Sequence, residues 1–120
     1  MPDPPTTRRM KTYTGGQGYV YQYYFVGQRP ALDPPPATEF IFDVTADRKT
    51  TFSVSVFLPA AALAAWAARH GRPLTDAEQY GAAKLRLFQG FDEIENMMAE
   101  GRRLLLDEAG LQAISATLAL

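Results

Sequence analysis

The fold is decided by residues 39–57, which read EFIFDVTADRKTTFSVSVF. Apolar and polar residues alternate on both sides of a polar link, residues 46–50, as they do in the two strands of a β-hairpin. One face of this ribbon is apolar and the other is mostly polar, which favours an antiparallel pair with one side on a core. The side chains expected to face that core are Phe40, Phe42, Val44, Phe52, Val54 and Val56.

An aromatic strand is expected just before the hairpin, because residues 18–27 read GYVYQYYFVG and hold four of the six tyrosines. Alternation sends an aromatic set of side chains to one face and a half-apolar set to the other. The first set is Tyr19, Tyr21, Tyr23 and Phe25, and the second is Val20, Gln22, Tyr24 and Val26. The sequence leaves open which set joins the core, since a one-residue slip of register exchanges the two faces.

Helices are expected after the hairpin. Residues 60–70 are rich in alanine, the best helix former, and Gly71 can end this helix in the left-handed conformation. Near the C-terminus, Asp107 can cap a helix over residues 108–118, where leucine and isoleucine recur at helical spacing. Both helices would bury an apolar stripe against the sheet.

A further helical region lies between these two. Thr75 and Glu78 form a capping box, so a helix is expected from the next residue, Asp76, to about Gln89. Gly90 is expected to interrupt it, and residues 92–95 offer a second cap for a short helix. One bent helix over residues 76–100 is the alternative.

These elements define the expected fold class, an α+β domain whose three- or four-stranded antiparallel β-meander is packed on one face by three or four helices. Residues 102–106 supply the fourth strand or form a loop. Residues 1–12 are rich in proline and carry three cations, so we expect them to form a flexible arm. Residues 13–120 are then the single domain.

The composition excludes several classes of function. The chain has no cysteine, which rules out disulfides, thiolate catalysis and cysteine-based metal sites. Its net charge of −1 gives no global attraction to nucleic acid or to anionic membranes. The N-terminus lacks the apolar segment of a signal peptide, and no stretch is long and apolar enough to span a membrane. We therefore expect a cytoplasmic protein, and the abundance of alanine, arginine and proline is typical of bacteria.

Catalytic and metal chemistry are not indicated. His70, the only histidine, lies at the end of an expected helix beside arginines, where a cation interacts well with the helix dipole. No nucleophile, base and orienting group occur together, so we predict a protein that is not an enzyme. The acidic side chains of residues 92–100 are explained by helix starts and supply no metal site. We expect no cofactor.

Our first functional hypothesis is a non-catalytic protein-interaction module that forms a homodimer through the aromatic strand or a sheet face, because tyrosine is enriched at interfaces. A different protein partner stays open. The alternative is a small molecule or single-stranded nucleic acid on the outer sheet face, although the pI of 5.8 argues against nucleic acid. A third hypothesis is an enzyme that uses His70 with an acidic partner.

The candidate residues have three expected roles. Tyrosines of the aromatic strand would bury area at an interface. Polar side chains around Asp43 would hold a ligand on the outer face, and Arg29 and Arg48 would form a basic edge. The candidates are Tyr19, Tyr21, Gln22, Tyr23, Tyr24, Arg29, Asp43 and Arg48.

Overall fold

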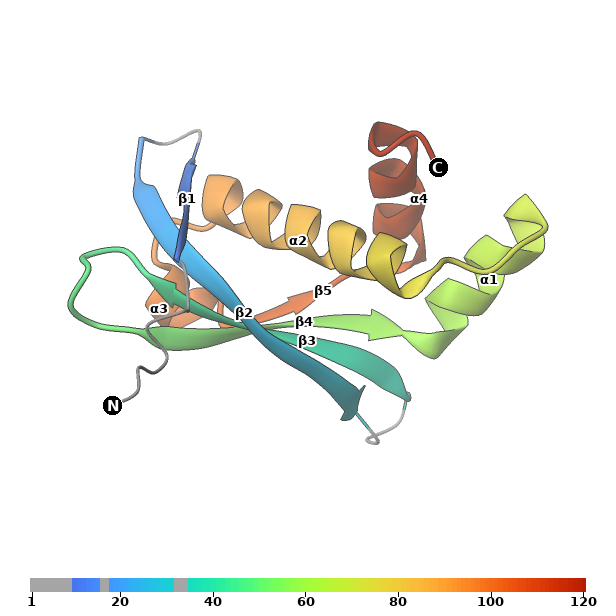
Figure 1. Cartoon of the computed structure of the whole chain (residues 1–120), viewed down its shortest axis with the longest axis horizontal. Coiled ribbons are helices and arrows are strands. Elements are labelled where there is room, and N and C mark those ends of the chain that lie inside the picture. The colour runs from blue at the N-terminus through green and yellow to red at the C-terminus, as the bar shows by residue number, and fades with distance from the viewer. Residues whose placement is uncertain (1–9, 16–17, 32–34) are drawn as a thin grey trace, which may run out of the picture.

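The computed structural model describes residues 10–15, 18–31 and 35–120. In this part of the chain, five strands form one sheet in the order β1-β2-β3-β4-β5, with helices packed against it (Figure 1). The strands are β1 (Lys11–Thr14), β2 (Val20–Ala31), β3 (Ala37–Thr45), β4 (Phe52–Pro59) and β5 (Arg103–Leu105). The helices are α1 (Ala60–His70), α2 (Asp76–Glu93), α3 (Met97–Glu100) and α4 (Glu108–Thr117). The expected α+β class with a meander core is confirmed.

The sheet has one strand that was not predicted, β1, and its predicted fourth strand, β5, is present but parallel to its neighbour. Strand β1 pairs antiparallel with β2 and begins at Lys11, inside the segment expected to be a flexible arm. Residues 1–9 of that predicted arm lie outside the described residues. Strand β5, formed by three residues of the segment 102–106, pairs with β4 in the parallel direction. A parallel neighbour requires a long crossover, which the helices α1, α2 and α3 supply.

The hairpin has the predicted register. Phe42 lies opposite Val54, and Val44 lies opposite Phe52. We call this side of the sheet the covered face, because helices pack on it and its hairpin side chains are at most 7% exposed. Burying one large apolar side chain stabilises a fold by about 1.5–3 kcal/mol, so this face dominates the core. Its members on the hairpin are Phe40, Phe42, Val44, Phe52, Val54, Val56 and Leu58.

The aromatic strand turns its tyrosine set toward the same core. Tyr21 and Tyr23 are only 3% and 4% exposed. The Tyr21 ring stacks on Phe91 of α2 with 4.2 Å between ring centroids, and the Phe25 ring lies 4.7 Å from that of Tyr80. Tyr21 and Phe25 therefore pack against helix α2 of the same chain, which leaves fewer aromatic side chains of β2 for an interface.

The helix ends predicted at Thr75 and Gly71 are present, but the break predicted at Gly90 is absent. Thr75 and Glu78 form the capping box, and Gly71 adopts the left-handed conformation with φ of 76°. Gly90 does not interrupt α2. A Cβ on Gly90 would lie 2.9 Å from Cδ1 of Leu104, so the glycine permits close packing of the helix on β5.

The helix ends later than predicted, at Glu93, and the two helices are separate rather than one bent rod. Ile94 leaves the helix with extended backbone angles. The next helix is capped by the Asn96 side chain, which accepts from the Ala99 N–H, and not by residues 92–95 as predicted. None of the described helices has the length and apolarity needed to cross a membrane.

Candidate functional site

The side of the sheet opposite the helices is uncovered over much of its described area. Figure 1 shows α2 and α4 on one side of the sheet only. On the other side Val20 and Leu105 are 47% and 55% exposed, and Ser53 is exposed. We call this side the open face. By register its members are Val20, Gln22, Tyr24, Glu39, Ile41, Asp43, Ser53, Ser55, Phe57, Arg103 and Leu105.

A charged network occupies the middle of the open face. The Arg29 Nε donates to Glu39 Oε1 at 2.9 Å, and the Ser55 hydroxyl donates to Glu39 Oε2 at 2.6 Å. These bonds, first that of Arg29 and then that of Ser55, lower the pKa of Glu39 although burial opposes the shift. A carboxylate bonded in this way stays ionised and fixed in place.

A β-bulge in β2 puts Arg29 in this network. The register shifts between Phe25 and Gly27, so that Val26 is the extra residue and Arg29 lies opposite Glu39. Without the bulge, strict alternation from the core residue Phe25 would send Arg29 to the covered face. The bulge therefore sets which side of the sheet receives this cation.

Two arginines and two serines surround a hollow at the β4–β5 edge of the open face. The hollow has a volume of about 370 Å³ and is lined by Ser53, Ser55, Arg102 and Arg103. The Arg102 Nε donates to the Ser53 carbonyl oxygen at 3.0 Å, and the Arg103 guanidinium lies 4.5 Å from the centroid of the Phe57 ring. Guanidinium and hydroxyl donors of this kind bind carboxylates and phosphates. We call it the arginine–serine hollow.

The structure brings together only some of the predicted site residues. Tyr24 lies opposite Asp43 across β2 and β3, with Gln22 two residues along the same face, as expected for a polar outer face. Tyr21 and Tyr23 are instead buried on the covered face and do not belong to the open face.

The predicted basic edge does not form. Arg29 pairs near the start of β3, whereas Arg48 lies in the loop that follows the end of β3. The Arg48 backbone N–H donates to the Thr45 hydroxyl at 3.0 Å, which fixes the cation in that loop. Antiparallel pairing therefore places the two cations at opposite ends of the strand.

Sequence reasoning missed Glu39, Ser55 and Arg103 as members of the site. Glu39 and Ser55 occupy polar positions of the alternating pattern, so the pattern itself could have singled them out. Arg103 joins them only because β5 pairs with β4 in parallel, with Arg103 opposite Ser55. No short-range signal indicates that pairing.

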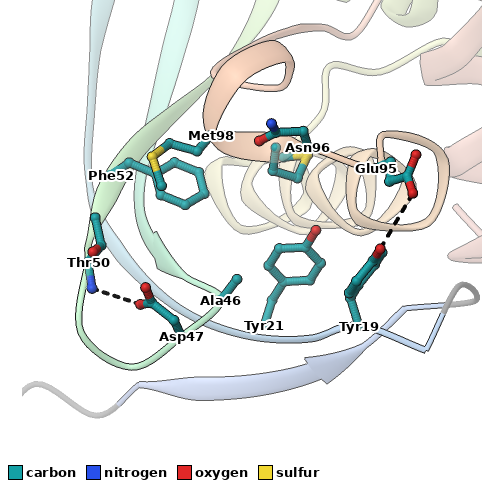
Figure 2. A pocket seen from close by; sticks show the side chains of 10 residues that line it. Tyr19, Tyr21, Ala46, Asp47, Thr50, Phe52, Glu95, Asn96 and Met98 are labelled. Carbon is teal, nitrogen blue, oxygen red and sulfur yellow. Dashed lines mark hydrogen bonds between the residues drawn. The ribbon is translucent and has the colours of Figure 1, made fainter.

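A cavity of about 500 Å³ lies at the rim of the core, on the helix side of the sheet (Figure 2). It opens between the start of β2, the loop after β3 and the connection from α2 to α3. The Tyr19 hydroxyl, at its mouth, donates to Glu95 Oε2 at 3.5 Å. We call it the rim cavity, and its lining residues are Tyr19, Tyr21, Ala46, Asp47, Thr50, Phe52, Glu95, Asn96, Met97 and Met98.

His70 has an amide partner. Its ring stacks on Trp66 with 4.0 Å between centroids, and its Nε2 lies 3.0 Å from the Gln112 Oε1. An amide cannot serve as the acidic partner that a His70 general base would need. Within the described residues, no three histidine or acidic side chains are grouped to hold a metal ion.

The chain matches no protein-family model, no curated protein and no solved structure. Function must therefore be argued from the open face and from the two cavities.

Proposed function

We propose that this chain is a non-catalytic interaction module that forms a homodimer by packing the open faces of two copies together. The observation that carries the proposal is the uncovered sheet face, where the aliphatic side chains of Val20 and Leu105 are half exposed. A chain without cysteine needs no oxidising compartment, so we place the module in the bacterial cytoplasm as part of the same proposal.

The open face has the size of a weak interface. The five strands hold 36 residues together, and β1 and β5 are much shorter than β2 to β4. At ~3.3 Å per residue and ~4.8 Å between strands, the sheet has a footprint of about 570 Å². This footprint is smaller than the ~800 Å² per partner of a standard specific interface, so a dimer should need a high micromolar concentration.

The charges of the open face suit a second copy of the same chain. Arg29 on β2 and Arg103 on β5 are cations, while Glu39 on β3 is a carboxylate. A two-fold axis across the face can set cations of one copy against carboxylates of the other. A net charge of −1 leaves little repulsion between copies. Tyr21 and Tyr23 of the aromatic strand no longer support a dimer, since they are buried inside the chain.

Sedimentation equilibrium tests the dimer. We expect a mass near twice the 13.3 kDa of the chain at high micromolar concentration. Leu105→Lys should weaken association by at least about tenfold, because a buried lysine must be desolvated, while an edge strand tolerates lysine in the monomer. The matched control is Ala113→Lys on the exposed side of α4. A strictly monomeric wild type, or equal weakening by the control, contradicts the proposal.

The arginine–serine hollow favours a second candidate function, the binding of an anionic small molecule on the open face. Two guanidinium groups and the Ser53 hydroxyl line this site as donors, while the Ser55 hydroxyl already donates to Glu39. Pyrophosphate should bind there, and Arg103→Gln should weaken it by about threefold or more, whereas Arg69→Gln on α1 should not. A short oligothymidylate is the probe for single-stranded nucleic acid, and its binding must then fall steeply with salt.

A further inference from the structure

The rim cavity is separate from the open face. Tyr21 and Phe52, two of its lining residues, belong to the covered side of the sheet. The remaining walls come from the loop after β3 and from residues 95–98. Its volume of about 500 Å³ lies within the ~300–1,000 Å³ range of ligand pockets. A ligand held there would leave the sheet face free.

The walls of the cavity are aromatic rings and a thioether. Figure 2 shows the rings of Tyr19 and Tyr21 side by side along one wall, with Phe52 and Met98 on the opposite side. Tyr19 and Met98 remain 45% and 46% exposed, so part of this apolar lining is in contact with solvent. Aromatic faces carry a negative quadrupole that attracts cations.

Two carboxylates stand at opposite ends of the cavity, Asp47 on the loop after β3 and Glu95 after α2 (Figure 2). The backbone N–H groups of Lys49 and Thr50 both donate to Asp47 Oδ1 at 2.8 Å. The bonds from Thr50 and Lys49, with a further one from the Thr45 hydroxyl at 3.1 Å, lower the pKa of Asp47 and keep it ionised. The Glu95 carboxylate is bonded within the cavity only by the long contact from Tyr19.

The lining of the cavity is negatively charged. Among the described residues that line the cavity there are two carboxylates and no lysine, arginine or histidine. Helix α2 ends at Glu93, just before Glu95, with no basic residue in its last turn. Its C-terminal carbonyl groups therefore contribute a partial negative charge that no neighbouring side chain on the helix offsets.

One wall of the cavity already attracts a cation. The Arg102 guanidinium lies 6.0 Å from the centroid of the Phe52 ring, although Arg102 is not among the lining residues. The same pairing occurs where Arg103 lies over Phe57 and Arg72 over Trp66. The chain thus uses aromatic rings as cation platforms, and the rim cavity combines such rings with carboxylates.

We propose that the rim cavity binds an organic cation, an ammonium or guanidinium group carried on a short apolar chain. The charged head lies between Asp47 and Glu95, and the apolar chain packs against Tyr19, Tyr21 and Met98. The cation can belong to a free amine or to a lysine or arginine side chain of a protein partner, because the cavity recognises only the head and its stem.

An NMR titration that follows the methionine methyl signals tests this with two matched probes, pentylamine and 1-pentanol. We expect pentylamine to shift the Met98 signal and to bind at least about tenfold more tightly than pentanol, which lacks the charge. Glu95→Gln and Asp47→Asn should each weaken pentylamine by about three- to tenfold. Asparagine keeps the Oδ1 acceptor on which the loop depends.

The control is Glu93→Gln, an exposed carboxylate that does not line the cavity. It should change pentylamine binding by less than about twofold. Equal binding of pentanol, equal weakening by Glu93→Gln, or no shift of Met98 would overturn the proposal. Leu105→Lys on the open face should leave pentylamine binding unchanged. The test of the rim cavity therefore does not depend on the test of the dimer.

A third probe, Nα-acetyl-lysine N-methylamide, identifies the source of the cation. Binding at least as tight as that of pentylamine assigns the cavity to a side chain of a protein partner. Exclusion of this probe while pentylamine binds assigns it to a free amine. Both results sustain a cation site, and they differ only in whether the mouth of the cavity admits a polypeptide backbone.

Discussion

The covered face and the open face of the β3–β4 hairpin are built from alternate residues of the same two strands, yet they are completed in different ways. The covered face is closed by helices α1 and α2 of the chain itself, which leaves its side chains almost fully buried. The open face combines exposed aliphatic groups with a bonded charge network around Glu39. Successive side chains of each strand point to opposite faces. The residues that stabilise the core therefore alternate with the residues that can contact a partner.

The largest expected loss of stability comes from a substitution on the covered face. Phe42→Ala should lower the free energy of unfolding by about 3–5 kcal/mol, because Phe42 is fully buried and its loss leaves a cavity. Val20→Thr, on the open face, should change it by less than about 0.5 kcal/mol at low micromolar concentration. Urea denaturation followed by Trp66 fluorescence measures both, and comparable losses would mean that the two faces are energetically alike.

A smaller effect concerns the close approach of α2 to β5. Gly90→Val should destabilise the fold by about 1–3 kcal/mol, since Leu104 already lies where the Cβ would stand. Gly81→Val is the matched substitution on the same helix, and there the Cβ would meet only Leu118 Cδ1 at an ordinary 3.8 Å. It should change stability by less than about 0.5 kcal/mol. Equal losses would contradict a special role for this close packing, because helix propensity alone favours valine over glycine at both positions.

Lowering the pH should destabilise the fold through protonation of Glu39 on the open face. Its pKa is lowered in the folded chain by the bonds from Arg29 and Ser55. The ionised carboxylate therefore stabilises the fold above the ordinary pKa of 4.5, and this contribution is lost as the pH falls below that value. Urea midpoints between pH 6 and pH 3 should fall less steeply in Glu39→Gln. Parallel profiles for the variant and the wild type would exclude Glu39 as a source of acid sensitivity.

The smallest effect lies on neither face, at the start of α2. Hydrogen bonds from Arg72 and from the Thr75 backbone lower the pKa of Glu78 from 4.5 to about 2. Its contribution is present above pH 4.5 and is lost between about pH 4.5 and pH 2. Glu78→Gln should remove part of the acid slope in that window, as measured by helical circular dichroism. Because Glu78 is only half-buried and its partner Arg72 is exposed, salt should reduce the difference, and a slope insensitive to salt would contradict this account.

The hairpin, its register and the helix caps could be predicted because each depends on residues close together in the sequence. Alternation from Phe40 to Val56 fixes both strands and the buried side. The capping box at Thr75 fixes the start of α2 within four residues of sequence. The prediction that Gly90 interrupts the helix was wrong, because this glycine allows close packing against Leu104, a residue of another element.

The candidate sites could not be predicted in the same way, since their members come from distant segments. The bulge at Val26 changes the side on which Arg29 lies without altering the composition of the strand. The rim cavity joins three separate regions of the chain, and the carboxylates at its two ends are Asp47 and Glu95. Tyr21 and Tyr23, which suggested a surface, are instead buried against Phe91 of α2, a residue distant in the sequence.

The parallel strand β5 also has a consequence for the order of folding. Contacts within the meander join neighbours in sequence, whereas Arg102 reaches Ser53 across a separation of 49 residues. Local pairing is fast and long loops close slowly, so we expect the β2–β3–β4 meander to form before β5 docks. Until then the outer edge of β4 exposes unpaired backbone groups that can pair with another chain. The slow closing step is thus the stage at which this protein is most exposed to aggregation.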